Sequence, residues 1–367
     1  MPRYSPLHEK HRALGAKLAD FGGWDMPIEY PATSGGGVVN EHVAVRESVG
    51  LFDVSHLGKA EVSGEDALES LNAAFTNDLT KIGDGQAQYT MLCDPNSGGV
   101  VDDLIVYRKS RNDFLLVPNA ANTAEVVRRL QSGNDSKKFS IRDCHEKYGV
   151  LALQGPKSSA VLNNLGVTSN LSYMSFQVSN IAGSEVIICR TGYTGEHGFE
   201  ILPLWSDTSK IWEALSNEIQ KFGGRVCGLG ARDTLRTEMG YPLHGHELSL
   251  EITPVQANAG WAVGWKKNTF WGREILLNER EMGPKRIQRG LRLLEKGIPR
   301  LGMSVTASGK PIGVVTSGTF SPTIKCGIAL ALLASDIELG ARVSIDVRGK
   351  LLDAEVVKPP FVESRVK

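Results

Sequence analysis

The apolar pattern of this chain changes at Met282-Gly283-Pro284, and this change limits the possible folds more than any other feature. Before it, stripes with helical spacing alternate with strand-like runs. After it, short apolar runs such as Gly313-Val314-Val315 and Val343-Ser344-Ile345 are separated by Gly and Pro. Regular short strands with turns between them are typical of a small barrel or sandwich. We therefore predict a domain boundary near residue 283 and an all-β domain over 283–367.

The part before residue 283 predicts a mixture of helices and strands. Between residues 59 and 142 the order is strand, helix, three strands, helix, strand, which indicates an α+β layer and not a doubly wound sheet. At the N-terminus, Leu7, Leu14 and Leu18 share one helical face and predict a first helix. A second helix is predicted from Asn40, as its cap, to Ser48.

Charge and composition exclude several classes of protein. The chain has 41 basic and 41 acidic residues and therefore lacks the basic surplus of a nucleic-acid binder. We see no apolar run of the ~20 residues that a membrane helix needs, and no secretory signal at the start. The five cysteines are scattered without a CxxC pair, so a zinc site or disulfide framework is not expected. We expect a cytoplasmic protein.

Two adjacent carboxylates interrupt the apolar run from Val100 to Tyr107. Neighbouring residues on a strand point to opposite faces, so Asp102 and Asp103 should point opposite ways, and an unpaired buried charge is costly. One interpretation places both carboxylates in solvent at the end of a strand. The other makes one of them a catalytic carboxylate in a partly apolar site.

A glycine-rich stretch runs from Arg190 to Glu200 and interleaves three glycines with Tyr193, Phe199 and two glutamates. It predicts either a hairpin with glycines in its turn or a loop that lines a ligand site. In the second case an aromatic ring would stack on a flat ligand. Glu200 could then accept two parallel hydrogen bonds from an amidine-like edge such as that of a pterin.

Three further segments leave alternatives open. Gly228-Leu229-Gly230 precedes a predicted helix with Arg232 and Asp233, which could receive an anion at its N-terminus or form ion pairs with neighbours. The segment from His244 to Glu247 is either a weak metal site or a polar turn. His56 is either a buried, hydrogen-bonded histidine or a site residue.

Short segments along nearly the whole chain share order and spacing with one known family. They are Leu7-His8-Glu9-Lys10-His11, Phe21-Gly22-Gly23-Trp24-Asp25-Met26-Pro27, Gly50-Leu51-Phe52-Asp53-Val54-Ser55-His56, Asp102-Asp103-Leu104, Asn119-Ala120-Ala121-Asn122, Leu153-Gln154-Gly155-Pro156, Arg190 to Glu200, Gly228 to Asp233, and Thr316-Ser317-Gly318-Thr319-Phe320-Ser321-Pro322. In these segments the chain resembles the glycine cleavage T-protein family.

The resemblance implies an α+β, three-domain, folate-binding fold with a C-terminal all-β barrel. The implied domains are 1–55 with 146–282, then 56–145, then 283–367. The implied activity is that of an aminomethyltransferase, which takes a methylene group from the aminomethylated lipoyl arm of the H-protein, releases ammonia and forms 5,10-methylenetetrahydrofolate. Tetrahydrofolate is a co-substrate of this family and no metal is needed.

The resemblance also implies the roles of individual residues. The essential carboxylate of the family falls on Asp103. The folate-binding positions fall on Glu200, Arg232, Tyr89, Asn119, Tyr173, Tyr193 and Trp261.

The chain departs from the family pattern in two places, the glycine-rich loop Ser34-Gly35-Gly36-Gly37 and the short tail after Phe361. We carry no folate-binding role over to Arg365. Three rivals remain: a folate-dependent demethylating domain, which normally accompanies a flavin domain, a folate-binding iron–sulfur maturation protein, and a binding protein that has lost catalysis. The maturation group has a Lys-Gly-Cys motif, whereas Lys325 and Cys326 are adjacent here.

Overall fold

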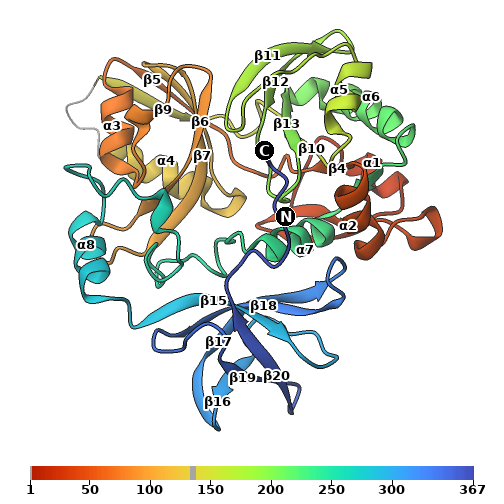
Figure 1. The fold of residues 1–367 in the computed structure, drawn as a ribbon. Coiled ribbons are helices and arrows are strands. Elements are labelled where there is room, and N and C mark those ends of the chain that lie inside the picture. Colours follow the sequence, from red (N-terminus) through yellow and green to blue (C-terminus); the bar gives the residue numbers. More distant parts are fainter. Residues whose placement is uncertain (1, 133–137) are drawn as a thin grey trace.

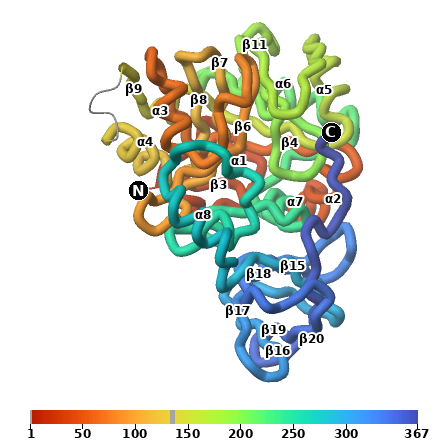
Figure 2. The backbone as a smooth tube through the Cα atoms, turned by 60° about the vertical axis from the view of Figure 1, so that its left-hand side comes forward, coloured from red at the N-terminus to blue at the C-terminus, as the bar shows by residue number. Residues whose placement is uncertain are grey.

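Four β-sheets, one of them closed into a barrel, organise the part of the chain described by the computed structural model, residues 2–132 and 138–367 (Figure 1). A five-stranded and a six-stranded sheet lie side by side in the upper half of the molecule. The barrel lies below them and extends away from them (Figure 2). The predicted α+β class and the C-terminal barrel are confirmed.

The five-stranded sheet is antiparallel throughout. Along the chain, its strands and helices follow the predicted succession. Helices α3 (Ala67–Ala74) and α4 (Thr123–Ser132) cover one face, where Leu104 and Val106 join the buried core. The other face points toward the centre of the molecule and carries Ile105 and Tyr107. In sheet order the strands are β6 (Gln86–Cys93), β7 (Val100–Ser110), β8 (Asp113–Val117), β5 (Ala60–Gly64) and β9 (Phe139–Asp143).

The six-stranded sheet combines strands that are far apart in the sequence. Helices α5 (Ser158–Asn164) and α6 (Thr208–Gln220) supply the core on one face, and α2 (Val38–Glu47) and α7 (Leu229–Met239) lie toward the other. In sheet order the strands are β11 (Phe176–Ile181), β12 (Ser184–Cys189), β13 (Gly198–Pro203), β10 (Leu151–Gln154), β4 (Gly50–Asp53) and β14 (Arg225–Cys227).

The N-terminal segment differs from the prediction of one helix through Leu18. Helix α1 covers only His8–Ala13, and Gly15 follows with a φ of 72°, a conformation that ends a helix. Leu18 instead belongs to a hairpin, in a small sheet whose order is β1 (Arg3–Tyr4), β3 (Trp24–Glu29) and β2 (Lys17–Phe21). Helix α2 begins at Val38, with Gly37 as its cap, so the predicted cap at Asn40 is wrong.

The glycine-rich loop before α2 and the start of α7 meet at one buried carboxylate. Glu41 accepts hydrogen bonds from the backbone nitrogens of Tyr30 (2.8 Å), Gly37 (3.2 Å) and Gly228 (2.8 Å). A side chain of the protein itself therefore holds the nitrogen at the start of α7, where the sequence left open an external anion.

The barrel is attached to the rest of the molecule through α7, which contacts β17 and β18 on one side and β3 on the other. The tail then runs back from the barrel, and the backbone nitrogen of Arg365 donates to the carbonyl of Gly195 (2.7 Å). Around the barrel the strands are β15 (Arg286–Leu293), β18 (Cys326–Ala334), β17 (Lys310–Ser321), β16 (Ser304–Ala307), β19 (Arg342–Val347) and β20 (Lys350–Val357).

The segment between α7 and the barrel packs on the five-stranded sheet. Phe270 and α8 (Arg273–Met282) bury Leu276 against Met91 and Val100. The predicted limits of the three domains stay a prediction. Short 3-10 helices complete the fold: η1 (Ala32–Ser34), η2 (Leu79–Lys81), η3 (Ala120–Asn122), η4 (Trp205–Asp207) and η5 (Gly260–Ala262).

Candidate active site

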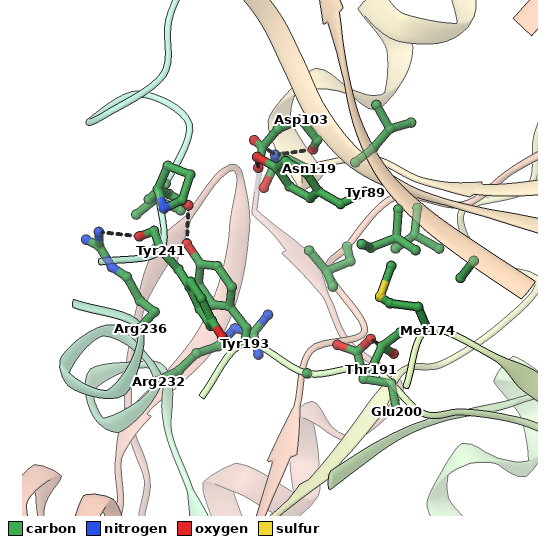
Figure 3. Close-up of a pocket in the computed structure, with 18 of the residues that line it drawn as sticks. Tyr89, Asp103, Asn119, Met174, Thr191, Tyr193, Glu200, Arg232, Arg236 and Tyr241 are labelled. Carbon is green, nitrogen blue, oxygen red and sulfur yellow. Dashed lines mark hydrogen bonds between the residues drawn. The ribbon is translucent and has the colours of Figure 1, made fainter. Parts of the chain in front are cut away.

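A cavity of about 650 Å³ lies between the inner faces of the two large sheets (Figure 3). Its lining is mainly apolar, with a few polar side chains that converge on it from three directions. All eight residues predicted for the site line this cavity: Tyr89, Asp103, Asn119, Tyr173, Tyr193, Glu200, Arg232 and Trp261. The tertiary structure thus brings together positions that are up to 172 residues apart in the sequence (Tyr89 to Trp261).

Asp103 reaches the cavity because it shares the inner face of β7 with Ile105 and Tyr107. Tyr89, on the neighbouring strand β6, donates its hydroxyl hydrogen bond to Asp103 Oδ2 (2.9 Å). Asn119 Nδ2 lies 2.9 Å from the other oxygen, Oδ1. The carboxylate is therefore held at both oxygens and still borders the cavity.

Asp102 does not line the cavity and is completely buried. The interpretation that both carboxylates are solvated at a strand end is therefore wrong. Asp102 shares the helix-covered face of β7 with Leu104 and Val106, which explains its burial. Strand β8 ends at Val117, so no residue of that strand pairs with Asp103. Asn119 takes the vacant position beside β7, and its side chain contacts both Asp102 Oδ1 (2.9 Å) and Asp103 Oδ1.

Burial and mutual repulsion make the two carboxyl groups unusually basic. Burial first, and the charge of Asp103 next, raise the pKa of Asp102 to about 8. Burial also raises the pKa of Asp103, although the hydrogen bonds from Tyr89 and Asn119 act in the opposite direction. Two such close carboxyl groups lose their protons as a pair, so the site can hold a proton near neutral pH.

Aromatic rings flank this carboxylate on the side toward solvent. Tyr89 stacks on Trp261, with ring centroids 5.1 Å apart. Trp261 is 68% exposed although it lines the cavity, so it stands at the mouth. Tyr173 is also partly exposed and lies under the guanidinium of Arg190.

Glu200 lies at the opposite end of the cavity from Asp103, beside Thr191 and Met174 (Figure 3). It is on β13 and only 8% exposed, and the hydroxyl of Thr191 donates to its Oε2 (2.6 Å). Tyr107 lies 3.3 Å from the same hydroxyl. This end therefore offers a buried carboxylate whose side-chain donor among the described residues is Thr191.

Arg232 enters the cavity from the first turn of α7, and its guanidinium lies 4.8 Å from the ring centre of Tyr193. Its buried Nη1 has no hydrogen-bond partner among the described residues. Burial lowers the pKa of Arg232, and the carboxylate of Glu200 opposes this effect. An unpaired buried guanidinium nitrogen is costly, which indicates that a ligand oxygen or ordered water completes the site.

Several lining residues were not predicted from the sequence. Thr191 lies in the stretch that was singled out, but its role as the partner of Glu200 depends on the pairing of β12 with β13. Tyr241 stacks on Tyr193 with centroids 5.7 Å apart, and Arg236 forms an ion pair with Glu247 (2.9 Å). The sequence could have indicated Tyr241, because it lies between Gly240, a glycine at the end of a predicted helix, and Pro242.

His244 and His246 each have a hydrogen-bond partner, whereas the buried Nδ1 of His56 has none among the described residues. His244 lies 3.0 Å from the side chain of Asn122 and His246 lies 2.8 Å from the carbonyl of Thr316, so the segment from His244 to Glu247 is a hydrogen-bonded polar turn. Residues 2–132 and 138–367 contain no group of three His, Cys, Asp or Glu that could hold a metal ion. His56 is buried and lines the cavity, and burial lowers its pKa well below the usual value.

Comparison with known proteins places the chain in one family. The model of the GCVT N-terminal domain matches residues 7–267, and that of the glycine cleavage T-protein C-terminal barrel domain matches residues 286–363. The chain belongs to the glycine cleavage T-protein family. The resemblance expected from the sequence is therefore confirmed.

Relatives of this family match the chain from end to end. The aminomethyltransferase of Parafrankia sp. (strain EAN1pec) is 56% identical over 363 residues, which cover 99% of this chain and 98% of the relative. The aminomethyltransferase of Mycobacterium tuberculosis (strain ATCC 25618 / H37Rv) is 52% identical over 366 residues, with the same coverage. The crystal structure of glycine cleavage system aminomethyltransferase T from Bartonella henselae matches with a TM-score of 0.92 and 34% identity, over 100% of this chain and 99% of that one.

The helices of this T-protein family member are all too short or too polar to cross a bilayer, as far as the described residues are concerned.

Proposed function

We propose that this protein is an aminomethyltransferase that moves the methylene carbon of an aminomethyl group from the lipoyl arm of an H-protein to tetrahydrofolate and releases ammonia. The observation that carries the proposal is the carboxylate of Asp103, which borders the cavity and is held at both oxygens by Tyr89 and Asn119. Relatives called aminomethyltransferase at 50–56% identity over the full chain support the activity. We expect the protein in the cytoplasm.

The cavity suits the flat, hydrogen-bonding head group of a folate. Its volume of about 650 Å³ lies within the range of ~300–1,000 Å³ that is typical of small-molecule sites. Glu200 can accept hydrogen bonds from the N–H edge of a pterin, and the unpaired nitrogen of Arg232 can donate to its oxygen. The rings of Tyr193 and Tyr241 provide apolar surface beside this polar end.

When bound, tetrahydrofolate supplies the nitrogen nucleophiles that accept the carbon. The residues of the chain do the rest by position and charge. The amine leaves the carbon as ammonia and the carbon–sulfur bond breaks as two folate nitrogens bond to the carbon, which leaves the lipoyl arm as a dithiol. Cationic character develops on that carbon, and the carboxylate of Asp103 stabilises it. Tyr89 and Asn119 keep the carboxylate in place, so little reorganisation is needed during the reaction.

The raised pKa of Asp103 also equips it to move a proton. A carboxyl group that titrates nearer to neutral pH can both accept and return a proton during turnover. Glu200 is buried at one end of the cavity, whereas Trp261 at the mouth is exposed, which leaves a route for a long arm. We also propose that Asn119, Tyr173 and Trp261 contact the bound folate.

Neither rival enzyme is favoured by a specific observation. Cys326, which the maturation activity would need as a reactive residue, lies at the start of β18 in the barrel and does not line the cavity. The relatives of full length carry the transferase name.

Replacement of the proposed catalytic carboxylate tests the function. We expect Asp103→Ala to lower the turnover number about 100-fold or more, because the developing positive charge loses its fixed partner. The assay uses aminomethylated H-protein and tetrahydrofolate and follows the release of ammonia. Asp336→Ala, at an exposed turn of the barrel, is the matched control and should keep wild-type turnover. Wild-type turnover in a folded Asp103→Ala protein would refute the assignment of Asp103.

A further inference from the structure

The second carboxylate of the pair has no part in the proposed reaction, yet it has an unusually complete set of hydrogen bonds. Asp102 Oδ1 accepts from Asn119 Nδ2 (2.9 Å) and Asn122 Nδ2 (2.7 Å), and Oδ2 accepts from the backbone nitrogen of Asn119 (3.0 Å). A buried carboxylate costs several kcal/mol unless such donors compensate. A hydrophobic side chain would suit this buried position better if packing were its only role.

A short chain of hydrogen bonds fixes Asp102 from behind. Asn122 Nδ2 also lies 3.0 Å from His244 Nδ1, and His244 Nε2 lies 3.1 Å from the carbonyl oxygen of Val100. Because a carbonyl only accepts, Nε2 must carry the hydrogen, and Nδ1 is then free to accept from Asn122. Each of the two hydrogens on Asn122 Nδ2 therefore has one acceptor, Asp102 or His244.

Asn119 connects this chain to the cavity. Its side-chain nitrogen lies within 3.0 Å of Asp102 Oδ1, Asp103 Oδ1 and the carbonyl oxygen of Asp103, but it has only two hydrogens to share among these three oxygens. A displacement of the Asp102 carboxylate therefore turns the Asn119 amide and moves the donor that orients Asp103.

We propose that Asp102 is a positioning residue that acts on Asp103 through the side chain of Asn119, and that Asn122 and His244 hold Asp102 in place. The proposal rests on the proposed function, because it assumes that Asp103 faces the reacting carbon. It assigns roles to Asn122 in η3 and to His244 in the loop after α7, neither of which lines the cavity.

Charge provides a second link between the two carboxyl groups. The titratable groups that face the pair are Tyr89 from β6, His244 from the loop after α7 and Tyr193 from the loop before β13. Two adjacent carboxyl groups repel each other once both are ionised, so the pair gives up its last proton at a higher pH than a single carboxyl group would. Loss of either charge should therefore lower that pH.

The first test interrupts the chain of hydrogen bonds without touching the cavity. We expect Asn122→Ala and His244→Ala each to lower kcat about 10-fold with an unchanged KM for tetrahydrofolate, because a misplaced carboxylate impairs the chemistry but not binding. His244→Gln can still accept from Asn122 and donate to Val100, and should recover most of the activity. Asn112→Ala, at the exposed turn between β7 and β8, is the matched control.

The second test is the pH profile of kcat in Asp102→Asn. Removal of one of the two charges should move the pH at which the pair loses its last proton to a lower value, whereas a merely structural role would lower kcat equally at every pH. Normal kcat in folded Asn122→Ala and His244→Ala proteins would overturn the proposal, as would an unshifted profile in Asp102→Asn. If Asp102→Asn does not fold, the Asn122 and His244 variants decide. Absence of turnover in the wild type would instead refute the proposed function.

Discussion

In the proposed function, single residues at the two ends of the cavity have different roles. Asp103 lies where the chemistry is expected, and Glu200 lies at the buried end, where only recognition is needed (Figure 3). The sequence alone left both roles open, because a carboxylate pair at a strand end and a glycine-rich hairpin each have an ordinary structural explanation. The burial of Glu200, with Thr191 as its side-chain donor within the described part of the chain, favours the ligand-lining interpretation.

At the residue scale we predict that Glu200→Gln weakens tetrahydrofolate binding about 10- to 100-fold. One accepting oxygen becomes a donor, and a hydrogen bond to a charged group contributes ~1.5–3 kcal/mol. Calorimetry with tetrahydrofolate measures the affinity directly, and kcat at saturation should change much less. Glu185→Gln, at an exposed position of β12 in the same sheet, is the control. Unchanged affinity in the Glu200 variant would remove this residue from the proposed site.

Elements determine whether these residues meet. Helix α7 delivers Arg232 to the cavity, and its start lies against β3 with almost no space between the backbones. A Cβ atom at Gly228 would be 2.3 Å from the carbonyl oxygen of Ile28, so a glycine is required there for close approach. The sequence predicted a helix start after this glycine, but nothing in the sequence indicated β3 as the neighbour.

At the element scale we predict that Gly228→Ala destabilises the protein and weakens folate binding together. The added methyl group would clash with backbone atoms of Ile28, which cannot easily move aside. Overpacking of this kind costs ~1–3 kcal/mol. Chemical denaturation gives the change in unfolding free energy, and calorimetry gives the affinity. Gly83→Ala is the control, because its Cβ atom would meet only a side-chain oxygen at 3.6 Å. Equal stability of the two variants would show that α7 tolerates displacement from β3.

At the scale of the whole molecule, one buried carboxylate on α7 links α2 to the barrel. Glu238 Oε2 pairs with Arg46 (2.8 Å) and His42 (3.2 Å) of α2, and the Glu238 carboxylate also accepts from Ser321 and Thr323 at the end of the barrel. Burial by itself would raise the pKa of Glu238, but the hydrogen bond and charge of His42, the charge of Arg46 and the hydrogen bond from Ser321 lower it to about 2. An ionised group therefore contributes to the contact between the barrel and the upper half.

At the scale of the whole molecule we predict an acid-sensitive contribution of Glu238 to stability. Its pKa is lower in the folded than in the unfolded chain, so the stabilisation is complete above pH ~4.5 and is lost as the pH falls toward 2. Glu238→Gln should be less stable than the wild type by ~3 kcal/mol near neutral pH, and the gap should narrow below pH ~4.5. Thermal or chemical unfolding across this pH range measures the gap. Exposed Glu281→Gln should show no gap, and a gap in Glu238→Gln that is independent of pH would contradict the prediction.

The sequence by itself determined the local character of most elements. The strand character of the apolar run in β7 and the all-β character of the chain after residue 283 depend on neighbouring residues only, and the structure bears out both predictions. Where a local pattern fitted two structures, the prediction was wrong. The apolar stripe through Leu18 predicted a helix, but α1 ends before Gly15 and the residues that follow form a hairpin with β3.

Only the tertiary structure decided how these elements form a site. The eight predicted residues come from segments that meet because two sheets and α7 pack around one cavity. Alternation along β7 does place Asp103 on the cavity face. Alternation could not reveal that Asp102 and Asp103 share Asn119, because this depends on the end of β8 at Val117 and on the position of Asn119 after it. Short-range patterns report on steric and apolar preferences of neighbours, whereas the basicity of the carboxylate pair arises from groups brought together by the fold.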